Sequence, residues 1–402
     1  MRSFLAVLVG KTARFLLRRI RRGGGSALPG TIAATIDPNL LKRAIDSAAM
    51  GLVVVSGSAG KSSTTKILVE LLRSHGLKVF TNPSTANIKQ GLYAAILQFG
   101  DHLGRIDADI VVLEWDEGHG AALAKNLKPK LAILTNVFSD QLDRFIDPEV
   151  VVEKLREIHD HSAQIVMNAD DRNLTQFADV SKTIGFQLAK NIQDQPEYAL
   201  NFGPNQEIAV STTVTSAGNG AVSLIHAGEQ LSFRTSADAV HQAMNLAAAI
   251  TALPLLVDVD WAKVVSTVEA LPPVFARDEV TDIRGRSVRL MLVQNPTSFA
   301  LNLEEISGTE RPLMLMAGGD IHDPSWLWTV DFSKLDYVDV VGGRNAHELA
   351  LRLKYQGVKI GAIATEADES SELFLSLPGD NPTILFSADA MRRTRRYLGL
   401  AK

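Results

Sequence analysis

The sequence predicts an α/β protein in which a central domain with a parallel sheet is followed by a C-terminal α/β domain. Two observations lead to this prediction. Short apolar runs that are typical of buried strands alternate with segments of helical spacing along most of the chain. Polar residues gather directly after these runs, at the strand ends where ligands bind in open parallel sheets. We therefore expect a ligand site at the carboxyl edge of the central sheet.

Composition places the chain among folded globular proteins. Its 402 residues are enough for two or three domains, each with a core of its own. Hydrophobic residues make up 46% and charged residues 21%, which excludes an intrinsically disordered protein. The net charge of −4 gives no reason to expect nucleic acid as a partner. The chain contains no cysteine, which excludes disulfides, thiolate metal sites and a cysteine nucleophile within it.

The first 22 residues are basic and amphipathic. The apolar stretch at residues 4–9 is too short to span a bilayer, and the arginines that follow it argue against a secretory signal. A helix here fits an anionic membrane surface, and it equally fits packing on its own domain with the arginines in solvent. The breaker-rich residues 21–30 predict a link that ends this helix.

A phosphate-binding loop is the strongest local signal. The apolar run at residues 52–55 predicts a buried strand, and helical spacing begins at Lys61. Between them, Gly57 and Gly60 permit backbone conformations in which amide groups turn toward a phosphate. The full phosphate-loop pattern has a glycine where this chain has Val55, but the strand and the helix that the mechanism needs are both present.

The loop and the helix that follows it supply the predicted nucleotide contacts. We expect Lys61 to reach the outer phosphates, and Ser62 or Ser63 to offer a hydroxyl to Mg²⁺. The nucleotide-binding residues predicted in this segment are Gly57, Ser58, Gly60, Lys61, Ser62 and Ser63.

The remaining elements follow from the same periodicities. In the central domain we expect strands at residues 78–81, 110–113, 131–134 and 164–167, and helices at 38–50, 61–75, 88–98, 148–159 and 240–255. The polar segment 190–235 indicates a small β insertion with strands at 208–214 and 221–225. In the C-terminal domain we expect strands at 288–293, 312–316, 337–341 and 382–386, and helices at 345–356 and 388–398.

The chain is predicted to divide into three parts. Residues 1–45 hold the basic helix and its glycine-rich link, residues 46–275 form the central ATP-binding domain with the 190–235 insertion, and residues 276–402 form the C-terminal domain. The proline pair Pro272-Pro273 marks the last boundary.

Charged residues follow several of the predicted strands. Glu114 ends the strand after the phosphate loop, where a carboxylate holds Mg²⁺ or orients a nucleophile. With Asp116 and Glu117 it makes three acids in four positions, so we expect a cation site there. Asp170 follows a later strand, where it either takes a ribose hydroxyl or caps a turn. Arg277 lies in a segment that resembles a hinge, and an arginine there would clamp a nucleotide when domains close.

One loop of the C-terminal domain has an unusual composition. Residues 318–328 combine acids and an imidazole with two tryptophans: Asp320, His322, Asp323, Trp326 and Trp328. The tryptophans belong either to the core or to a surface that faces a partner.

These motifs, in this order, resemble the Mur ligase superfamily, whose phosphate loop also lacks the early glycine. The matching segments are residues 56–62, 113–114, 135–136, 140–143, 168–171 and 275–278. Within the superfamily the chain most resembles the MurT family, the ligase half of lipid II isoglutaminyl synthases. That narrower resemblance involves residues 22–30, 140–145, 293–296, 323–328 and 351–355.

The resemblance implies a Mur-ligase-like central domain, the cofactors ATP and Mg²⁺, and ATP-dependent amide formation through an acyl phosphate in peptidoglycan synthesis. It implies catalytic roles for Lys61 and Glu114 and Mg²⁺ ligation by Ser62 and Glu114. It adds nucleotide contacts from Asn136, Asp170 and Arg277. In MurT proteins the substrate is the α-carboxylate of D-glutamate in the lipid II stem peptide, and the product is D-isoglutamine.

The resemblance also implies a partner. Ammonia would come from glutamine through a GatD-like amidotransferase with a nucleophilic cysteine, in a heterodimer, and the absence of cysteine here agrees with that division of labour. An aspartate of the last domain would complete the partner's Cys–His pair; we expect Asp323, with Asp320 second and Trp326 at the same interface. The alternative is that Asp323 only caps a turn. The expected location is the cytoplasm, with contact to the inner membrane face left open.

The chain departs from the MurT pattern at several points. MurT proteins usually carry a four-cysteine zinc ribbon in the central domain, and without cysteine no zinc is expected here. Gln294 stands where a lysine is usual, and Thr85 where the loop usually has glycine. Two other functions therefore stay open: a Mur-type ligase that adds an amino acid without a partner, and a nucleotide-binding scaffold without catalysis.

Overall fold

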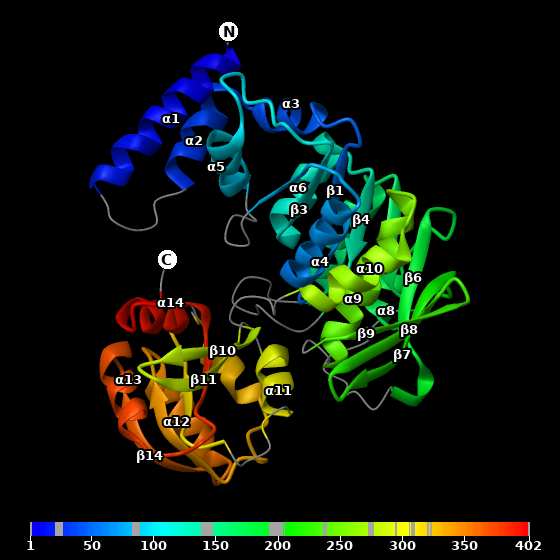
Figure 1. The fold of residues 1–402 in the computed structure, drawn as a ribbon. Helices are drawn as coiled ribbons and strands as arrows, with labels where there is room; N and C mark the ends of the chain where they lie inside the picture. Colours follow the sequence, from blue (N-terminus) through cyan, green and yellow to red (C-terminus); the bar gives the residue numbers. More distant parts are fainter. Residues whose placement is uncertain are drawn as a thin grey trace. The chain divides into compact units, whose positions relative to one another are not determined.

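The computed structural model describes residues 2–20, 27–82, 89–137, 148–192, 204, 206–235, 239–271, 277–293, 296–304, 306, 310–319, 321 and 324–400. The chain divides into two compact units, each with a sheet of its own (Figure 1). The first unit consists of Met1–Phe138 and Glu149–Leu271, and the second of Ser139–Pro148 and Pro272–Lys402. The α/β fold class predicted from the sequence is confirmed.

The first unit is built on a nine-stranded sheet in the order β2-β3-β1-β4-β5-β6-β7-β8-β9. Its strands are β1 (Leu52–Ser56), β2 (Val79–Thr81), β3 (Ile110–Glu114), β4 (Leu131–Leu134), β5 (Gln164–Asn168), β6 (Thr183–Leu188), β7 (Val210–Gly218), β8 (Ala221–His226) and β9 (Glu229–Arg234). From β2 to β7 in this order, including β1, adjacent strands are parallel, whereas the pairs β7–β8 and β8–β9 are antiparallel. This parallel arrangement brings the carboxyl ends of β1, β3, β4 and β5 to one edge.

The predicted β insertion is not a separate subdomain. Its strands β7 and β8 extend the main sheet, and a third strand, β9, was not predicted. The reason lies in burial, because alternate residues such as Val214, Leu224 and Phe233 point into the same apolar cluster as the central strands.

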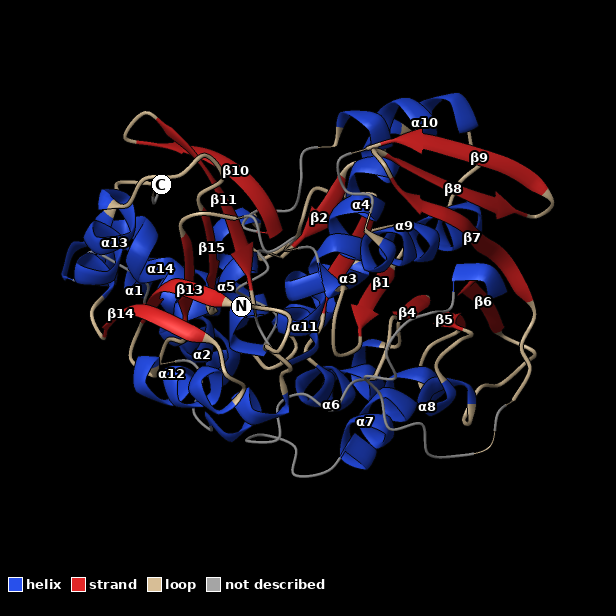
Figure 2. Ribbon diagram, turned by 90° about the horizontal axis from the view of Figure 1, so that it is seen from below, coloured by secondary structure: helices blue, strands red, loops and turns tan. Residues whose placement is uncertain are grey.

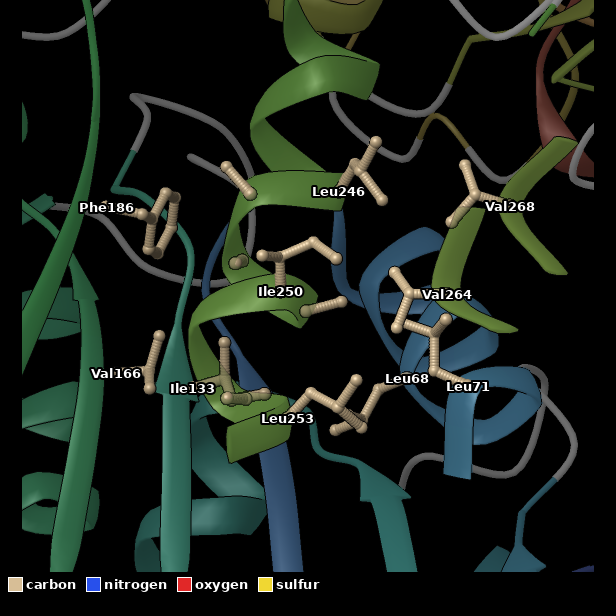
Figure 3. Packing of buried hydrophobic residues seen from close by; sticks show 14 of the residues in the cluster. Leu68, Leu71, Ile133, Val166, Phe186, Leu246, Ile250, Leu253, Val264 and Val268 are labelled. Carbon is tan, nitrogen blue, oxygen red and sulfur yellow. The ribbon is translucent and has the colours of Figure 1, made fainter. Parts of the chain in front are cut away.

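Helices cover both faces of this sheet (Figure 2). One face carries α4 (Lys61–Ser74), α9 (Val240–Ala252) and α10 (Trp261–Ala270), with η3 (Leu253–Leu255) after α9. The other carries α6 (Glu117–Leu127), α7 (Pro148–Asp160) and the short α8 (Arg172–Thr175), and η2 (Lys190–Ile192) follows β6. Figure 3 shows the first interface, where Leu68, Ile250 and Val264 from the three helices belong to one apolar cluster with Ile133 and Val166 of the sheet. This apolar core fixes β1 and α4, the two elements that flank the phosphate loop.

The N-terminal helices pack on one another at the end of the first unit: α1 (Arg2–Ile20), α2 (Ala27–Ile36), α3 (Leu40–Asp46) and α5 (Lys89–Phe99). The predicted link at residues 21–30 is wrong at its end, because α2 already begins at Ala27. Proline is tolerated in a first helical turn, so Pro29 does not prevent this start. Gly30 lets α2 approach α5 closely, because a Cβ at this position would lie 2.1 Å from the backbone oxygen of Gln90. Among the described residues, no helix combines the length and the apolar character that a membrane span requires.

The second unit is built on a six-stranded sheet in the order β10-β11-β15-β12-β13-β14, parallel except for the β10–β11 pair. Its strands are β10 (Arg277–Ile283), β11 (Arg286–Leu292), β12 (Leu313–Met316), β13 (Tyr337–Gly342), β14 (Lys359–Ala364) and β15 (Thr383–Phe386). Its helices are α11 (Pro296–Glu304), η4 (Pro324–Thr329), α12 (Ala346–Tyr355), α13 (Ala367–Ser376) and α14 (Ala388–Tyr397). Along β12, Leu313 and Leu315 pack into the apolar core on one face of the sheet. Met314 and Met316 pack into the apolar core on the other face.

Candidate functional site

The phosphate loop joins β1 to α4, as predicted. Gly57 has φ +130° and Gly60 has φ +83°, conformations that favour glycine. Space adds a second requirement at both positions. A Cβ on Gly57 would lie 2.3 Å from Oγ1 of Thr135, and one on Gly60 would lie 2.1 Å from Oδ1 of Asn245. The loop is therefore pressed against β4 on one side and α9 on the other.

The end of β4 holds the loop by hydrogen bonds. The side-chain amide of Asn136 forms two bonds with Ala59: the Ala59 amide donates to Oδ1 at 2.8 Å, and Nδ2 donates to the Ala59 carbonyl at 3.2 Å. The backbone oxygen of Asn136 accepts from the Ser58 amide at 2.9 Å. The Thr135 hydroxyl donates to the same Ala59 carbonyl at 2.7 Å. Asn136, predicted to contact nucleotide, thus shapes the loop itself, which makes it a positioning residue in this structure.

Lys61 meets an acid that lies 56 residues further along the chain. Its ammonium nitrogen lies 2.6 Å from Oε1 of Glu117 and also donates to the carbonyls of Gly57 and Ser58. The side chain of Glu117 is 2% exposed and that of Lys61 is 12% exposed. Oε2 of Glu117 is buried and has no hydrogen-bond partner among the described residues. The lysine that we expect to contact phosphate is therefore held over the loop by a buried acid of α6.

The three acids after β3 do not form the predicted cation cluster. Asp116 is the N-cap of α6 and accepts from the His119 amide at 3.2 Å, while Glu117 pairs with Lys61. Among the residues that the structure describes, no three His, Cys, Asp or Glu side chains gather in a way that could hold a metal ion. Two of the three acids therefore have other partners, because α6 begins directly after β3 and engages Asp116 as its cap.

A smaller donor set remains for Mg²⁺. Glu114 is buried at the end of β3 and is paired in register with Val55, just before the loop. Its backbone amide donates a hydrogen bond to the side-chain oxygen of Asn82 at 3.0 Å. Ser62 is partly exposed in the first turn of α4, whereas Ser63 is buried. Mg²⁺ in nucleotide sites usually takes one or two protein oxygens and completes its shell with phosphates and water. A carboxylate and a hydroxyl of this kind fit that ion chemically.

At the end of β5 the two aspartates have different environments. Asp170 accepts the amide of Leu188 at 2.7 Å and so supports the end of β6. Asp171 is buried, caps α8 through the Asn173 amide, and accepts the Val137 amide at 2.6 Å. Burial raises the pKa of Asp171 to about 6, against the lowering effect of these hydrogen bonds. Asp171 ties the end of β4 to the end of β5, a role that the sequence did not indicate.

Asn245 completes the surroundings of the loop from α9. It is buried, its Oδ1 faces Gly60, and it accepts from the Thr64 hydroxyl at 3.4 Å. The sequence placed it only near the start of a helix. Its contact with the loop depends on how α9 packs on α4, which no local pattern reveals.

Several predicted site residues lie outside the described residues: Asp320, Asp323, Gln294, Thr85 and residues 140–144. Arg277 was expected in a hinge, but its backbone begins β10 and pairs with Met291. Trp326, expected at a partner interface, is partly buried and stacks edge-on against Phe299 of the second unit, with ring centroids 6.3 Å apart. Trp328 instead contacts the exposed Tyr355.

Comparison with known families agrees with this geometry. Residues 55–253 match the model of the Mur ligase middle domain, and residues 292–388 match that of the MurT ligase C-terminal domain. Together the two models cover well over half of the chain.

Full-length relatives are found among curated proteins. The chain is 25% identical to the lipid II isoglutaminyl synthase (glutamine-hydrolyzing) subunit MurT of Streptococcus pneumoniae, over 89% of this chain and 88% of that one. It is 24% identical to the subunit of the same name in Staphylococcus aureus, over 90% of each chain.

Solved structures show the same fold. A pseudomurein peptide ligase type C from Methanothermus fervidus superposes with a TM-score of 0.72 at 18% identity, covering 90% of this chain and 80% of that one. MurF ligase from Thermotoga maritima, solved in complex with ADP, superposes with a TM-score of 0.67 at 19% identity, covering 92% and 83%. The predicted Mur-ligase-like fold is confirmed.

Proposed function

This chain belongs to the Mur ligase family, and from that premise we propose that it is the ATP-dependent ligase subunit of a lipid II isoglutaminyl synthase. The reaction would convert the α-carboxylate of D-glutamate in the lipid II stem peptide to the amide of D-isoglutamine, during peptidoglycan synthesis. The observation that carries this proposal is the presence, in one chain, of a formed phosphate loop and a C-terminal domain of the MurT type. Full-length relatives bearing the MurT name support the same conclusion.

The proposed chemistry has two steps. A carboxylate oxygen of the substrate attacks the γ-phosphorus of ATP, which forms an acyl phosphate and releases ADP. Ammonia then attacks the carbonyl carbon, inorganic phosphate leaves, and a proton is lost to give the amide. The related MurF structure in complex with ADP supports the assignment of a nucleotide site to this fold.

Residues of this chain would act mainly by position and charge. The backbone of the loop, shaped by Gly57 and held by Asn136, presents amides to the phosphates. Lys61 stabilises the negative charge that develops on the transferred phosphoryl group. Ser62 and Glu114 would hold Mg²⁺, which when bound neutralises phosphate charge.

We also propose that ammonia reaches this subunit from a GatD-like glutamine amidotransferase. The S. pneumoniae and S. aureus relatives are named as subunits of glutamine-hydrolysing enzymes, and the chain itself has no cysteine for a thiol glutaminase. Asp323 is our candidate for the aspartate that completes the partner's Cys–His pair, with Asp320 second. The reaction is placed in the cytoplasm, where ATP is available, on a lipid-linked substrate.

The test combines purification with an assay. The tagged chain is expressed with the glutamine amidotransferases of its source, and the complex is given lipid II, ATP and glutamine. We expect a stable complex that amidates lipid II. Asp323→Asn should abolish activity with glutamine and preserve activity with ammonium, whereas Asp320→Asn should preserve both.

Two outcomes would contradict the proposal. ATP-dependent addition of an amino acid by the chain alone would favour a Mur-type amino-acid ligase. Nucleotide binding without turnover, with or without the amidotransferase, would leave a non-catalytic scaffold. If Asp323→Asn also lost its activity with ammonium, Asp323 would have a role in the ligase reaction and not in the supply of ammonia.

A further inference from the structure

Helix α1 exposes its bulky apolar side chains. Four of them expose between 46% and 52% of their surface: Phe4, Leu5, Leu8 and Leu16. At 100° per residue these positions share about a third of the helix circumference, and we name them the α1 apolar face. Leu28, near the start of α2, is 54% exposed as well. A helix that packs on its own domain normally shows the opposite orientation, with its large apolar residues inside.

The orientation of α1 is fixed by its other side. Ala6 and Val7 are buried, and a Cβ on Gly10 would lie 2.6 Å from the side chain of Leu97 on α5. Polar contacts support the same seating, because Lys11 Nζ donates to the Gly100 carbonyl at 2.9 Å and Arg14 donates to Gln98. Rotation of α1 to bury its leucines would break these contacts and drive large side chains into a space that fits small ones.

Charge indicates which partner suits this face. The first 22 residues contain seven lysines and arginines and no aspartate or glutamate, although the whole chain has a net charge of −4. Helical geometry places Arg2 and Lys11 at the two borders of the α1 apolar face. An apolar stripe between basic residues is the pattern of a helix that lies in the interface of an anionic bilayer.

We propose that the α1 apolar face docks on the surface of an anionic phospholipid membrane. It does so as an interfacial helix, because no described helix is long and apolar enough to span a bilayer. The inference rests on the proposed function for its purpose, since docking would hold the ligase beside a substrate that is itself anchored in lipid. A second copy of the chain would present the same positive charge to this face, and so is disfavoured.

The experiment measures binding of the full chain to vesicles by flotation. We expect binding to vesicles of phosphatidylcholine with phosphatidylglycerol, weak binding to phosphatidylcholine alone, and a loss of about tenfold in affinity at high salt. Leu5→Gln/Leu8→Gln should lower the affinity for anionic vesicles by about tenfold or more. The independent pair Phe4→Gln/Leu16→Gln should do the same, which covers a failure of either variant to fold.

Matched controls and a second assay separate this inference from the proposed function. Val180→Gln/Ile225→Gln removes two other exposed apolar side chains of the same unit and should bind vesicles like the unchanged chain. In detergent, amidation of lipid II by Leu5→Gln/Leu8→Gln should be unchanged, and it should fall only when lipid II is in vesicles. Equal vesicle binding by all variants would overturn the inference, as would a shift of Leu5→Gln/Leu8→Gln from dimer to monomer without an effect on vesicle binding. Vesicle binding that depends on this face would support it whatever reaction the chain catalyses.

Discussion

The ammonium nitrogen of Lys61 lies 2.6 Å from Oε1 of Glu117, so a buried ion pair joins the phosphate loop to the first turn of α6. This contact does two things. It holds the loop lysine in place before a nucleotide arrives, and it gives a buried carboxylate the cation that it needs. In the proposed function, phosphate would share Lys61 with Glu117.

Replacing Lys61 by methionine should remove transition-state stabilisation while keeping the length of the side chain. We expect the rate of amidation to fall by about 10²–10³, the usual effect of losing a charged group aimed at developing charge. Lys125→Met, at an exposed position on α6, is the matched control and should leave the rate unchanged. Single-turnover formation of amidated lipid II gives the rate for each of the two variants. A Lys61→Met variant with an unchanged rate would contradict the role assigned to this lysine.

Glu117→Gln should destabilise the first unit by about 1–3 kcal/mol, because it leaves the Lys61 ammonium beside a neutral amide in a mostly buried site. In a double-mutant cycle with Lys61→Met, we expect a coupling energy of about 1–3 kcal/mol, with the double variant more stable than Glu117→Gln alone. Thermal unfolding of the four proteins provides the values. Strict additivity would mean that the pair is not formed in solution.

Asn136→Ala removes both side-chain hydrogen bonds to Ala59 and should leave the phosphate loop less ordered. At about 0.5–1.5 kcal/mol for each bond, the affinity for ADP should fall by about ten- to a hundredfold. Asn126→Ala, on the exposed face of α6, is the control. Isothermal titration with ADP and Mg²⁺ measures the change, and an unaltered affinity would show that the loop is held without Asn136.

Gly57 and Gly218 have similar φ angles but different surroundings, so alanine substitutions at the two positions distinguish the cost of backbone strain from the cost of a steric clash. Gly57 has φ +130° and closely faces Thr135, whereas Gly218 has φ +123° and has nothing within 4 Å of a Cβ. Gly218→Ala should cost about 1–2 kcal/mol through backbone strain alone. Gly57→Ala should cost clearly more and should also weaken ADP binding, because the loop must move away from β4. Equal melting temperatures for the two variants would show that Gly57 has more room than this structure gives it.

Asp171 makes stability depend on pH. Its pKa is about 6 in the folded chain, against an ordinary value of 3.8 for an aspartate, so the folded chain retains a proton between these pH values. Its contribution to the free energy of unfolding therefore falls as pH rises from about 4 to about 6, by about 3 kcal/mol in total, and does not change further above pH 6.

Asp171→Asn should remove this pH dependence. Because asparagine has one acceptor oxygen, it also loses one of the two hydrogen bonds from the Val137 and Asn173 amides and so lowers stability at every pH. Melting temperatures of both proteins between pH 4 and pH 7 test the prediction through their difference. Exposed Asp179 is a control with the opposite pH dependence, because hydrogen bonds from Ser181 lower its pKa. Its contribution to the free energy of unfolding is lost as pH falls toward the lowered pKa, and Asp179→Asn should remove that contribution. A difference between the curves of wild type and Asp171→Asn that does not vary with pH would refute the raised pKa.

The backbone of the phosphate loop could be predicted from neighbouring residues, but its tertiary contacts could not. The run before it and the helical spacing after it predicted β1 and α4 within a residue, and both glycines adopt positive φ as expected. The pattern could not show that Asn136 shapes the loop, because a strand-end asparagine looks the same in a sequence whether it faces a ligand or the backbone beside it. Asn245 was hidden for a similar reason, since its contact with Gly60 depends on the packing of α9 against α4.

The sequence by itself determined the fold class and the phosphate loop, because these depend on periodicity and spacing within short segments. It also carried the relationship to the Mur ligases, through the resemblance of its strand-end motifs to those of that family. Only the tertiary structure decided which of three neighbouring acids meets Lys61, which of two aspartates is buried, and that the polar segment after residue 190 continues the central sheet. It also decided that α1 turns its leucines outward. Those outcomes depend on strand register and on helix packing between residues far apart in the chain. Whether a given side chain is buried there depends on which distant side chains pack against it.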